Sequence, residues 1–219
     1  MEHRKIIEQT AAFVRATLAN AEGGHDWWHI HRVWLNAKKI AASEVADMLV
    51  VELAALLHDI ADSKFHGGDE EIGPTTAGKF LSGLNLDDAT IVHVQQIIRN
   101  ISFKSGFDKK DFHSNELGIV QDADRLDAIG AIGIARAFSY GGFKGREIYN
   151  PEINPNLTMT KEQYKNSPSP SINHFYEKLL LLKDKMNTET GKQMAAQRHH
   201  FMELYLQQFF NEAGVFIQE

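Results

Sequence analysis

The sequence contains no cysteine, and this absence removes three classes of chemistry at once. Disulfide bonds, thiolate metal sites and a cysteine nucleophile are all excluded. The chain also lacks a run of about 18 apolar residues, which a membrane-spanning helix would need. Its first ten residues carry charge where a signal peptide would be apolar. We therefore expect a cytoplasmic protein with no membrane partner.

The sequence also has no excess of basic over acidic residues. The 23 Lys and Arg residues are outnumbered by 29 Asp and Glu residues, which gives a formal net charge of -6. This balance argues against a broad face for nucleic acid. A small anionic substrate stays compatible with it, because a metal ion and a few basic side chains can reverse the local potential.

The pattern of apolar residues predicts an all-α fold. Apolar positions recur at three- and four-residue spacing, and no segment shows the alternation of a strand. We expect a buried helix over residues 45–60 and another over 120–138, in which Ala128, Ala131 and Ala135 form a small-residue face. A long irregular loop is predicted around residues 140–170, followed by C-terminal helices over 171–214. The 219 residues, 43% of them hydrophobic, suit a single domain over 1–219 with its chemistry in residues 24–138.

Three segments place His or Asp in otherwise apolar helices. They are GHDWWHIHRVW from Gly24 to Trp34, LLHDIADSK from Leu56 to Lys64, and QDADRLDAIGAIGIAR from Gln121 to Arg136. An unpaired buried charge costs several kcal/mol, so these groups need compensation. One divalent cation shared by the three segments would compensate all of them.

Their spacing is compatible with such a site. His58 and Asp59 are neighbours and project about 100° apart around a helix, so both can approach one ion. Asp62 lies four residues after His58 and points to the same side. Two imidazoles and two carboxylates form a mixed N/O set suited to Mn²⁺, Fe²⁺, Ni²⁺, Co²⁺ or Zn²⁺. An octahedral ion with four protein ligands keeps two positions for water or phosphate oxygens.

The ligands from the first and third segments are ambiguous on the residues alone. His25, His29 and His31 compete for one position, and Asp122 competes with Asp124 for another.

In this order, His-x-x-Arg-Val, LLHD and ADRLDA resemble the HD-domain superfamily of metal-dependent phosphohydrolases. With HFYEKLL (174–180) and RHHFM near Arg198, they are similar to its small bacterial single-domain subgroup. The resemblance runs from about residue 24 to the C-terminus and implies a helical bundle that hydrolyses phosphoester or phosphoanhydride bonds, commonly of nucleotides. It also implies that one divalent metal is held by His29, which keeps the His-x-x-Arg-Val register, by His58 and Asp59, and by Asp124, which directly precedes an Arg.

Further residues are candidates for catalysis. Asp62 would orient or deprotonate the attacking water, since alarmone-cleaving HD domains place a Glu there, or it would only hold His58 in place. Lys64 would bind substrate phosphate, and Lys144 and Arg146 in the long loop would close over phosphates.

Three candidates for substrate binding come from the motifs themselves. Asp127 would hold His or metal ligands in place or contact a ribose. Arg32 and Arg125 would bind substrate or pair with acidic neighbours.

The sequence thus predicts a metal-dependent phosphohydrolase of nucleotides, possibly a nucleoside triphosphate pyrophosphohydrolase. A phosphodiesterase or alarmone hydrolase, and a non-catalytic nucleotide-sensing module, are the alternatives. The metal would be Mn²⁺, Mg²⁺, Ni²⁺, Co²⁺, Fe²⁺ or Zn²⁺. The expected partner is a small nucleotide or phosphoester, and the apolar faces of the last helices leave a homodimer possible.

Overall fold

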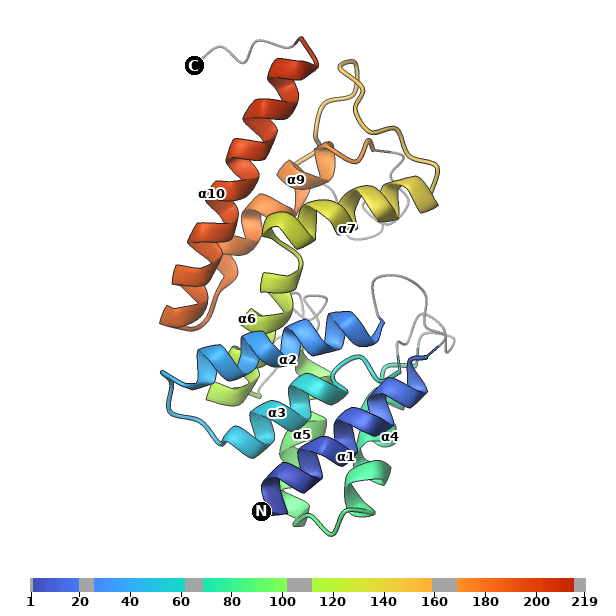
Figure 1. Cartoon of the computed structure of the whole chain (residues 1–219), viewed down its shortest axis with the longest axis vertical. Helices are drawn as coiled ribbons and strands as arrows, with labels where there is room; N and C mark the ends of the chain where they lie inside the picture. Colours follow the sequence, from blue (N-terminus) through green and yellow to red (C-terminus); the bar gives the residue numbers. More distant parts are fainter. Residues whose placement is uncertain (1, 20–25, 62–68, 102–111, 159–168, 215–219) are drawn as a thin grey trace. The chain divides into compact units, whose positions relative to one another are not determined.

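The computed structural model describes residues 2–19, 26–61, 69–101, 112–158 and 169–214. Every regular element in these ranges is a helix, which confirms the all-α prediction (Figure 1). The chain divides into two compact units, Met1–Asp124 and Arg125–Glu219. The boundary falls near the end of one helix, α6 (Asn115–Asp127). That residues 1–219 act as one domain stays a prediction.

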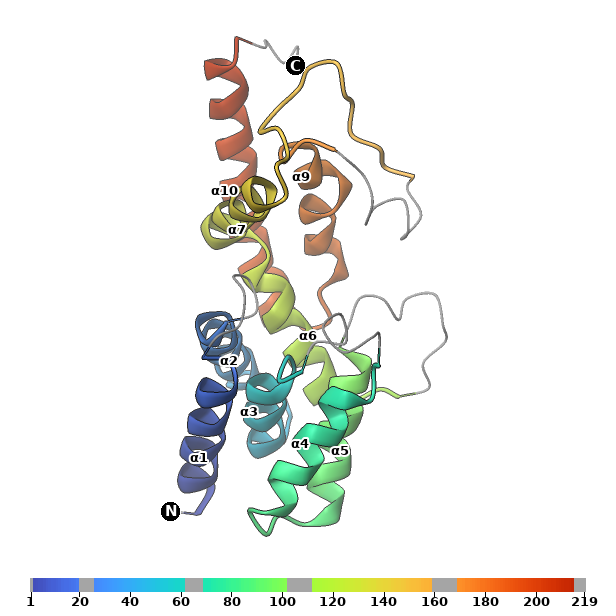
Figure 2. The same ribbon diagram turned by 90° about the vertical axis from the view of Figure 1, so that its right-hand side faces the viewer.

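The first unit is built around one apolar helix, α3 (Met48–Leu57), which packs against α1, α2 and α5. Helices α4 and α5 lie side by side (Figure 2). The other helices of this unit are α1 (Glu2–Thr17), α2 (Trp27–Ala41), α4 (Ile72–Ser82), α5 (Asp88–Asn100) and most of α6.

The two ends of helix α3 can be explained from its sequence. Asp47 caps its start, because the side-chain carboxylate accepts hydrogen bonds from the amides of Leu49 and Val50. Every residue from 50 to 57 is buried, as the nearly unbroken apolar run predicts. The helix ends at Leu57, three residues earlier than predicted. His58 follows as the C-cap with helical backbone angles, φ -59° and ψ -32°.

The second unit joins α7 (Gly130–Phe143) to the long final helix α10 (Glu189–Glu212). A short α9 (Asn173–Glu177) and a 3₁₀ helix, η3 (Leu179–Lys185), pack together, and η3 also contacts α10. Phe175 is fully buried and stacks on Tyr205, with ring centroids 5.9 Å apart. These contacts give the unit a core of its own.

The predicted helix over 120–138 is wrong, because the chain forms two helices there. Helix α6 ends at Asp127 and α7 begins at Gly130, whose φ of 74° lies in the left-handed region that favours glycine. The predicted face of small residues is wrong too, since Ala131 and Ala135 are exposed.

The C-terminal part follows the prediction in outline. The irregular stretch begins after Phe143, and within residues 144–158 no regular helix or strand is present. Within the expected C-terminal helices over 171–214, the first part forms the short α9 and the 3₁₀ helix η3. Thr188 caps the start of helix α10, because its hydroxyl accepts a hydrogen bond from the Gly191 amide. None of the helices in the described part of the chain combines the length and apolar character that crossing a membrane requires.

Candidate metal centre

Helix α2 presents His29 to the interior of the first unit. Its start is fixed by Asp26, whose carboxylate accepts a hydrogen bond of 2.9 Å from the His29 amide. His29 lies on the same face as Val33 and Ala37, both of which are fully buried. The residue as a whole is only 1% exposed. A polar ring therefore occupies a position where the helix pattern otherwise places core residues.

The ring of His58 is oriented by the last turn of α3. Its Nδ1 lies 2.8 Å from the carbonyl oxygen of Ala55. A carbonyl oxygen can only accept a hydrogen bond, so Nδ1 carries the proton. The Nε2 of neutral His58 is then left with its lone pair, which is the form that binds a metal ion. Local helix geometry thus selects the tautomer.

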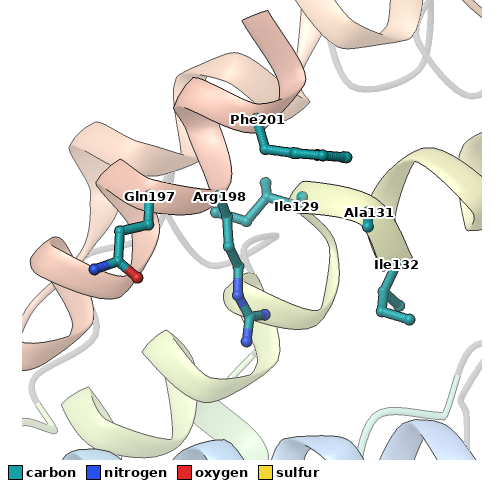
Figure 3. A pocket seen from close by; sticks show the side chains of 7 residues that line it. Ile129, Ala131, Ile132, Gln197, Arg198 and Phe201 are labelled. Carbon is teal, nitrogen blue, oxygen red and sulfur yellow. The ribbon is translucent and has the colours of Figure 1, made fainter. Parts of the chain in front are cut away.

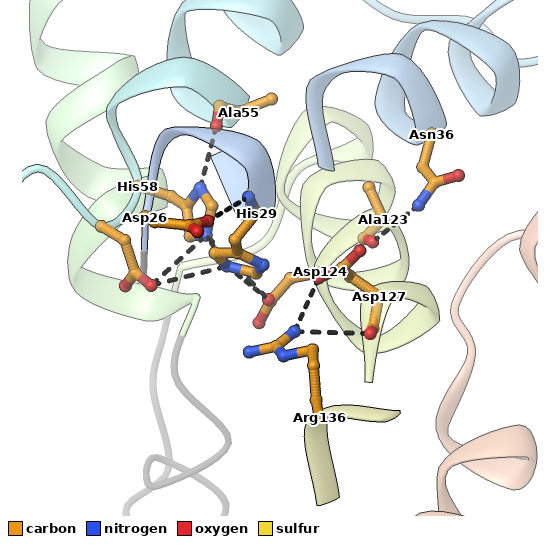
Figure 4. Close-up of polar contacts among 10 residues, drawn as sticks. Asp26, His29, Asn36, Ala55, His58, Ala123, Asp124, Asp127 and Arg136 are labelled. Atoms are coloured by element: carbon orange, nitrogen blue, oxygen red, sulfur yellow. Dashed lines mark hydrogen bonds and ion pairs between the residues drawn. The ribbon is translucent and has the colours of Figure 1, made fainter. Parts of the chain in front are cut away.

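Four side chains from the three sequence segments lie close together, and Figure 4 shows His29, His58 and Asp124 pointing toward one another. The Nε2 atoms of His29 and His58 are 3.3 Å apart. Asp59 places Oδ2 at 3.6 Å from the His29 nitrogen and 3.8 Å from the His58 nitrogen. Asp124 places Oδ1 at 3.6 Å and 3.9 Å from the same two atoms. The structure therefore brings together the four residues that the motifs single out.

The donor set fits a divalent cation. Nitrogen and oxygen ligands bind such ions at about 2.0–2.2 Å, so neighbouring ligand atoms lie about 3.0–3.5 Å apart. The distances between these four residues are at or slightly above that range. Ligand atoms of His29, His58 and Asp59 lie within 4.8 Å of one another. Two imidazoles with two carboxylates form a mixed N/O set of the kind that binds first-row divalent metals.

The centre is closed on its histidine side and open on its carboxylate side. The His29 and His58 side chains are each 2% exposed, whereas those of Asp59 and Asp124 are 24% and 40% exposed. The carboxylates therefore remain accessible from solvent while the imidazoles are held by the core. This asymmetry allows a ligand to approach the centre from one side.

The competing candidates lie elsewhere or outside the described residues. His31 packs against three tryptophans, with ring centroids 5.7 Å from Trp27, 5.8 Å from Trp28 and 5.9 Å from Trp34. Asp122 is fully buried in α6. Residue 25 lies outside the described residues, and the structure is therefore silent on that histidine.

Two of the predicted substrate contacts form structural contacts in the second unit. The Arg125 guanidinium donates to the backbone carbonyl of Lys185. The Asp127 side chain, 2% exposed, accepts from Arg136 at 2.6 Å (Figure 4). Both side chains therefore have protein partners within this unit.

Some of the remaining predicted residues are exposed or partly buried, and others lie outside the described residues. Lys144 is exposed, and its ammonium lies 5.1 Å from the centre of the Phe143 ring and 5.7 Å from that of Tyr140. Arg146 also lies over Tyr140, at 5.7 Å. Arg32 is partly buried on α2. Asp62 and Lys64 lie outside the described residues.

Sequence reasoning missed a buried carboxylate that ties three helices together. Glu52 is 7% exposed and accepts a hydrogen bond of 2.8 Å from the Trp34 indole. Its carboxylate also lies 3.7 Å from the Lys38 ammonium and 3.4 Å from the His3 ring. A single charged residue inside the apolar run of α3 was the available signal. This network joins α1 and α2 to the helix that ends at His58.

A pocket of about 310 Å³ lies in the second unit, between the start of α7 and the middle of α10 (Figure 3). Its guanidinium group, from Arg198, donates to the carbonyl of Leu126. The pocket contains no His or carboxylate, so it has none of the ligands of the metal centre. It is lined by Ile129, Gly130, Ala131, Ile132, Gln197, Arg198 and Phe201.

Comparison with known proteins connects this geometry to a family. Residues 27–129 match the family model of the HD domain. The uncharacterized protein YpgQ of Bacillus subtilis is 37% identical, over 95% of this chain and 94% of that protein. A crystal structure of an HD-superfamily hydrolase from Bacillus thuringiensis is 42% identical, with a TM-score of 0.78, and covers 97% of this chain and 98% of that one.

A crystal structure of B. subtilis YpgQ in complex with ADP is also similar. It has a TM-score of 0.77 and 35% identity, and covers 97% of each chain. Identity at this level over nearly the whole length shows common descent and not only a shared fold. The matched region also contains His29, His58, Asp59 and Asp124. The chain therefore belongs to the HD-domain family, among the HD-superfamily hydrolases.

Proposed function

We propose that this protein is a metal-dependent phosphohydrolase that cleaves phosphoanhydride or phosphoester bonds of nucleotides. Hydrolysis of nucleoside triphosphates to monophosphate and pyrophosphate is the leading reaction. The observation that carries the proposal is the meeting of two buried imidazoles, whose Nε2 atoms are 3.3 Å apart, with two accessible carboxylates that each lie within 3.9 Å of both nitrogens. The ADP complex of the similar YpgQ supports a nucleotide as ligand.

In this proposal His29, His58, Asp59 and Asp124 hold one divalent metal, which is Mn²⁺, Mg²⁺, Ni²⁺, Co²⁺, Fe²⁺ or Zn²⁺. Such an ion supplies Lewis acidity, because it polarises a phosphoryl oxygen and lowers the pKa of a water molecule. The protein's contribution is to hold the donors in position. The bond from His58 Nδ1 to Ala55 and the burial of His29 do this before any ligand arrives.

The other roles fall on basic and acidic side chains. Asp62 orients the attacking water, whose oxygen adds to phosphorus as the bond to the leaving phosphate or pyrophosphate breaks. Lys64 binds the phosphates, and Lys144 and Arg146 neutralise the charge on the leaving group. The rings of Tyr140 and Phe143 hold the Lys144 ammonium near the end of α7. Arg32, Arg125 and Asp127 remain candidates for secondary substrate contacts.

The test is release of phosphate and pyrophosphate from a panel of nucleotides, by metal-stripped protein refilled with each metal in turn. We expect one metal to restore turnover of triphosphates, with pyrophosphate as product. Asp59→Asn should lose at least about 100-fold in kcat/KM, because it removes one ligand charge while keeping the side-chain shape. Asp88→Asn, at an exposed position of α5, is the matched control and should keep full activity.

Each other outcome points to a different function. Turnover only of diesters or of guanosine alarmones would replace the proposed reaction with one of those activities. Nucleotide binding without release, with any metal, would contradict the enzyme and favour a nucleotide sensor.

We also propose a cytoplasmic location and leave a homodimer as a prediction. Sedimentation analysis tests the second, since a species of about 24.7 kDa would contradict the dimer.

A further inference from the structure

Helix α2 contacts α6 through a pair of proposed metal ligands and also through a side-chain amide. His29 and Asn36 are seven residues apart, which is close to two helical turns, so their side chains share one face of α2. The Nε2 of His29 lies 3.6 Å from Oδ1 of Asp124. The side-chain amide of Asn36 donates to the carbonyl of Ala123 at 3.4 Å (Figure 4). The two contacts therefore end on adjacent residues of α6.

The Ala123 carbonyl that accepts from Asn36 is also the acceptor of a regular backbone hydrogen bond within α6. Helix α6 continues to Asp127, whose amide is the regular i+4 donor to Ala123. The Asn36 bond is therefore not needed to satisfy a buried backbone group. Its remaining effect is to link one helix to a defined point on another.

Such a link matters because apolar burial alone does not fix the position of the part of α6 that carries Asp124. Leu117, Val120 and Ala123 are buried, but burial of apolar surface is non-directional and does not fix how far one helix slides along another. A hydrogen bond is directional and does fix it. Because Ala123 directly precedes Asp124, the Asn36 bond locates the backbone from which that carboxylate projects.

Other side-chain amides attach α6 further from the centre. Gln121 donates to the carbonyl of Asn100 at 3.0 Å, and Asn115 donates to the carbonyl of Val45 at 2.8 Å. Asn115 is nine residues before Asp124, or about 13 Å along the helix axis. Loss of its bond would loosen the start of α6 and leave the end that carries Asp124 in place. Asn115 thus provides a control with the same chemistry.

We infer that Asn36 is a positioning residue of the metal centre, which sets Asp124 at ligand distance from His29 through its bond to Ala123. The inference rests on the proposed binding of a divalent ion by His29, His58, Asp59 and Asp124. Asn36 itself is not a ligand in this arrangement. Its effect passes through the backbone of α6.

The test is calorimetric titration of metal-stripped protein with Mn²⁺, together with the thermal unfolding midpoint in EDTA. We expect Asn36→Leu to weaken Mn²⁺ binding about 10-fold or more, as loss of a group that orients a ligand does in other metal sites. Asn115→Leu loses the same kind of bond and should bind Mn²⁺ within about two-fold of wild type. The unfolding midpoint in EDTA should fall no more for Asn36→Leu than for Asn115→Leu. If Asn36→Leu does not fold, Asn36→Ala replaces it under the same criteria.

Three results would overturn the inference. Wild-type affinity for Mn²⁺ in Asn36→Leu would show that the bond from Asn36 to Ala123 does not control the position of the Asp124 carboxylate. Equal losses of affinity in both variants would show a general loosening of α6. Absence of any Mn²⁺ binding by the wild-type protein would overturn the proposed metal centre as well, whereas the first two results would leave that centre intact.

Discussion

Histidines in the two units have different neighbours. His29 and His58, in the first unit, face the carboxylates of Asp59 and Asp124. His174, in the second unit, is partly buried near the cations Lys178 and Arg146. Burial is the main cause that lowers its pKa from 6.5 to about 3, and the charges of Lys178 and Arg146 lower it further. His174 therefore stays neutral in the folded protein at every physiological pH.

This burial predicts a loss of stability in mild acid. The pKa of His174 is lower in the folded state than in the unfolded state, so protonation favours unfolding. Its contribution to stability is complete above about pH 6.5 and decreases as the pH falls toward about 3. Between about pH 7 and 5 we expect the free energy of unfolding to fall by about 1–2 kcal/mol from this residue.

Denaturant unfolding in EDTA at those two pH values checks the prediction. His174→Gln should remove most of the fall, since its side chain does not titrate. His113→Gln, which changes an exposed histidine, should leave it unchanged. Equal pH dependence in wild type and His174→Gln would contradict the prediction.

The sequence predicted which residue types lie near the candidate metal centre, but it only partly predicted which side chains face the core. His29 and His31 are two residues apart, which turns them about 200° from each other on a helix. Only one of them can face the core, and the choice depends on where the helix begins and how it packs. The HD-type register selected His29, and Asp26 fixes the start of α2 in the structure. His31 packs instead against Trp27 and Trp34, and no local sequence pattern predicts these contacts.

At the scale of elements, the junction of α6 and α7 explains the wrong prediction of one long helix. The apolar period and the alanines continue across residues 120–138, so local propensity favours helix throughout. Two glycines override it. Gly130 adopts a positive φ, and Gly133 lies so close to the turn before α7 that a Cβ there would be 2.2 Å from the Ala128 carbonyl oxygen. A close approach of this kind is a tertiary property and is absent from helix periodicity.

Gly133→Ala should therefore destabilise the protein. A methyl group at 2.2 Å from a backbone oxygen forces the backbone to shift, which costs about 1–3 kcal/mol. Gly142→Ala, in the same helix and with no atom within 4 Å of the new Cβ, should be neutral or stabilise by up to about 1 kcal/mol. The free energy of unfolding of both variants is the measurement. Equal stability of the two variants would show that the backbone at Ala128 can move away from the new methyl group at no cost in free energy.

At the scale of the whole molecule, the proposed metal ligands and the histidine that makes the protein sensitive to acid lie in different units. All four proposed ligands lie in Met1–Asp124, while His174 lies in Arg125–Glu219. A ligand that binds only the folded state stabilises it by mass action. A metal ion acts on the unit that holds the ligands, whether or not the two units unfold together.

Thermal unfolding should therefore depend on metal. Mn²⁺ at 100 times its dissociation constant should add about 2.7 kcal/mol, and EDTA should remove that gain. The shift should disappear in Asp59→Asn and persist in Asp88→Asn. Scanning calorimetry with and without Mn²⁺ measures it. An equal shift in wild type and Asp59→Asn would place the binding elsewhere in the chain.

Helix α2 also gives the protein an optical label. The chain has three tryptophans, and all of them, Trp27, Trp28 and Trp34, lie on this one helix. Emission excited at the red edge of protein absorption therefore originates entirely from the element that carries His29. Paramagnetic ions quench nearby indoles, and Trp28 directly precedes His29. If Mn²⁺ binds at the proposed centre, the intrinsic fluorescence of the unmodified protein should therefore fall as the metal is added.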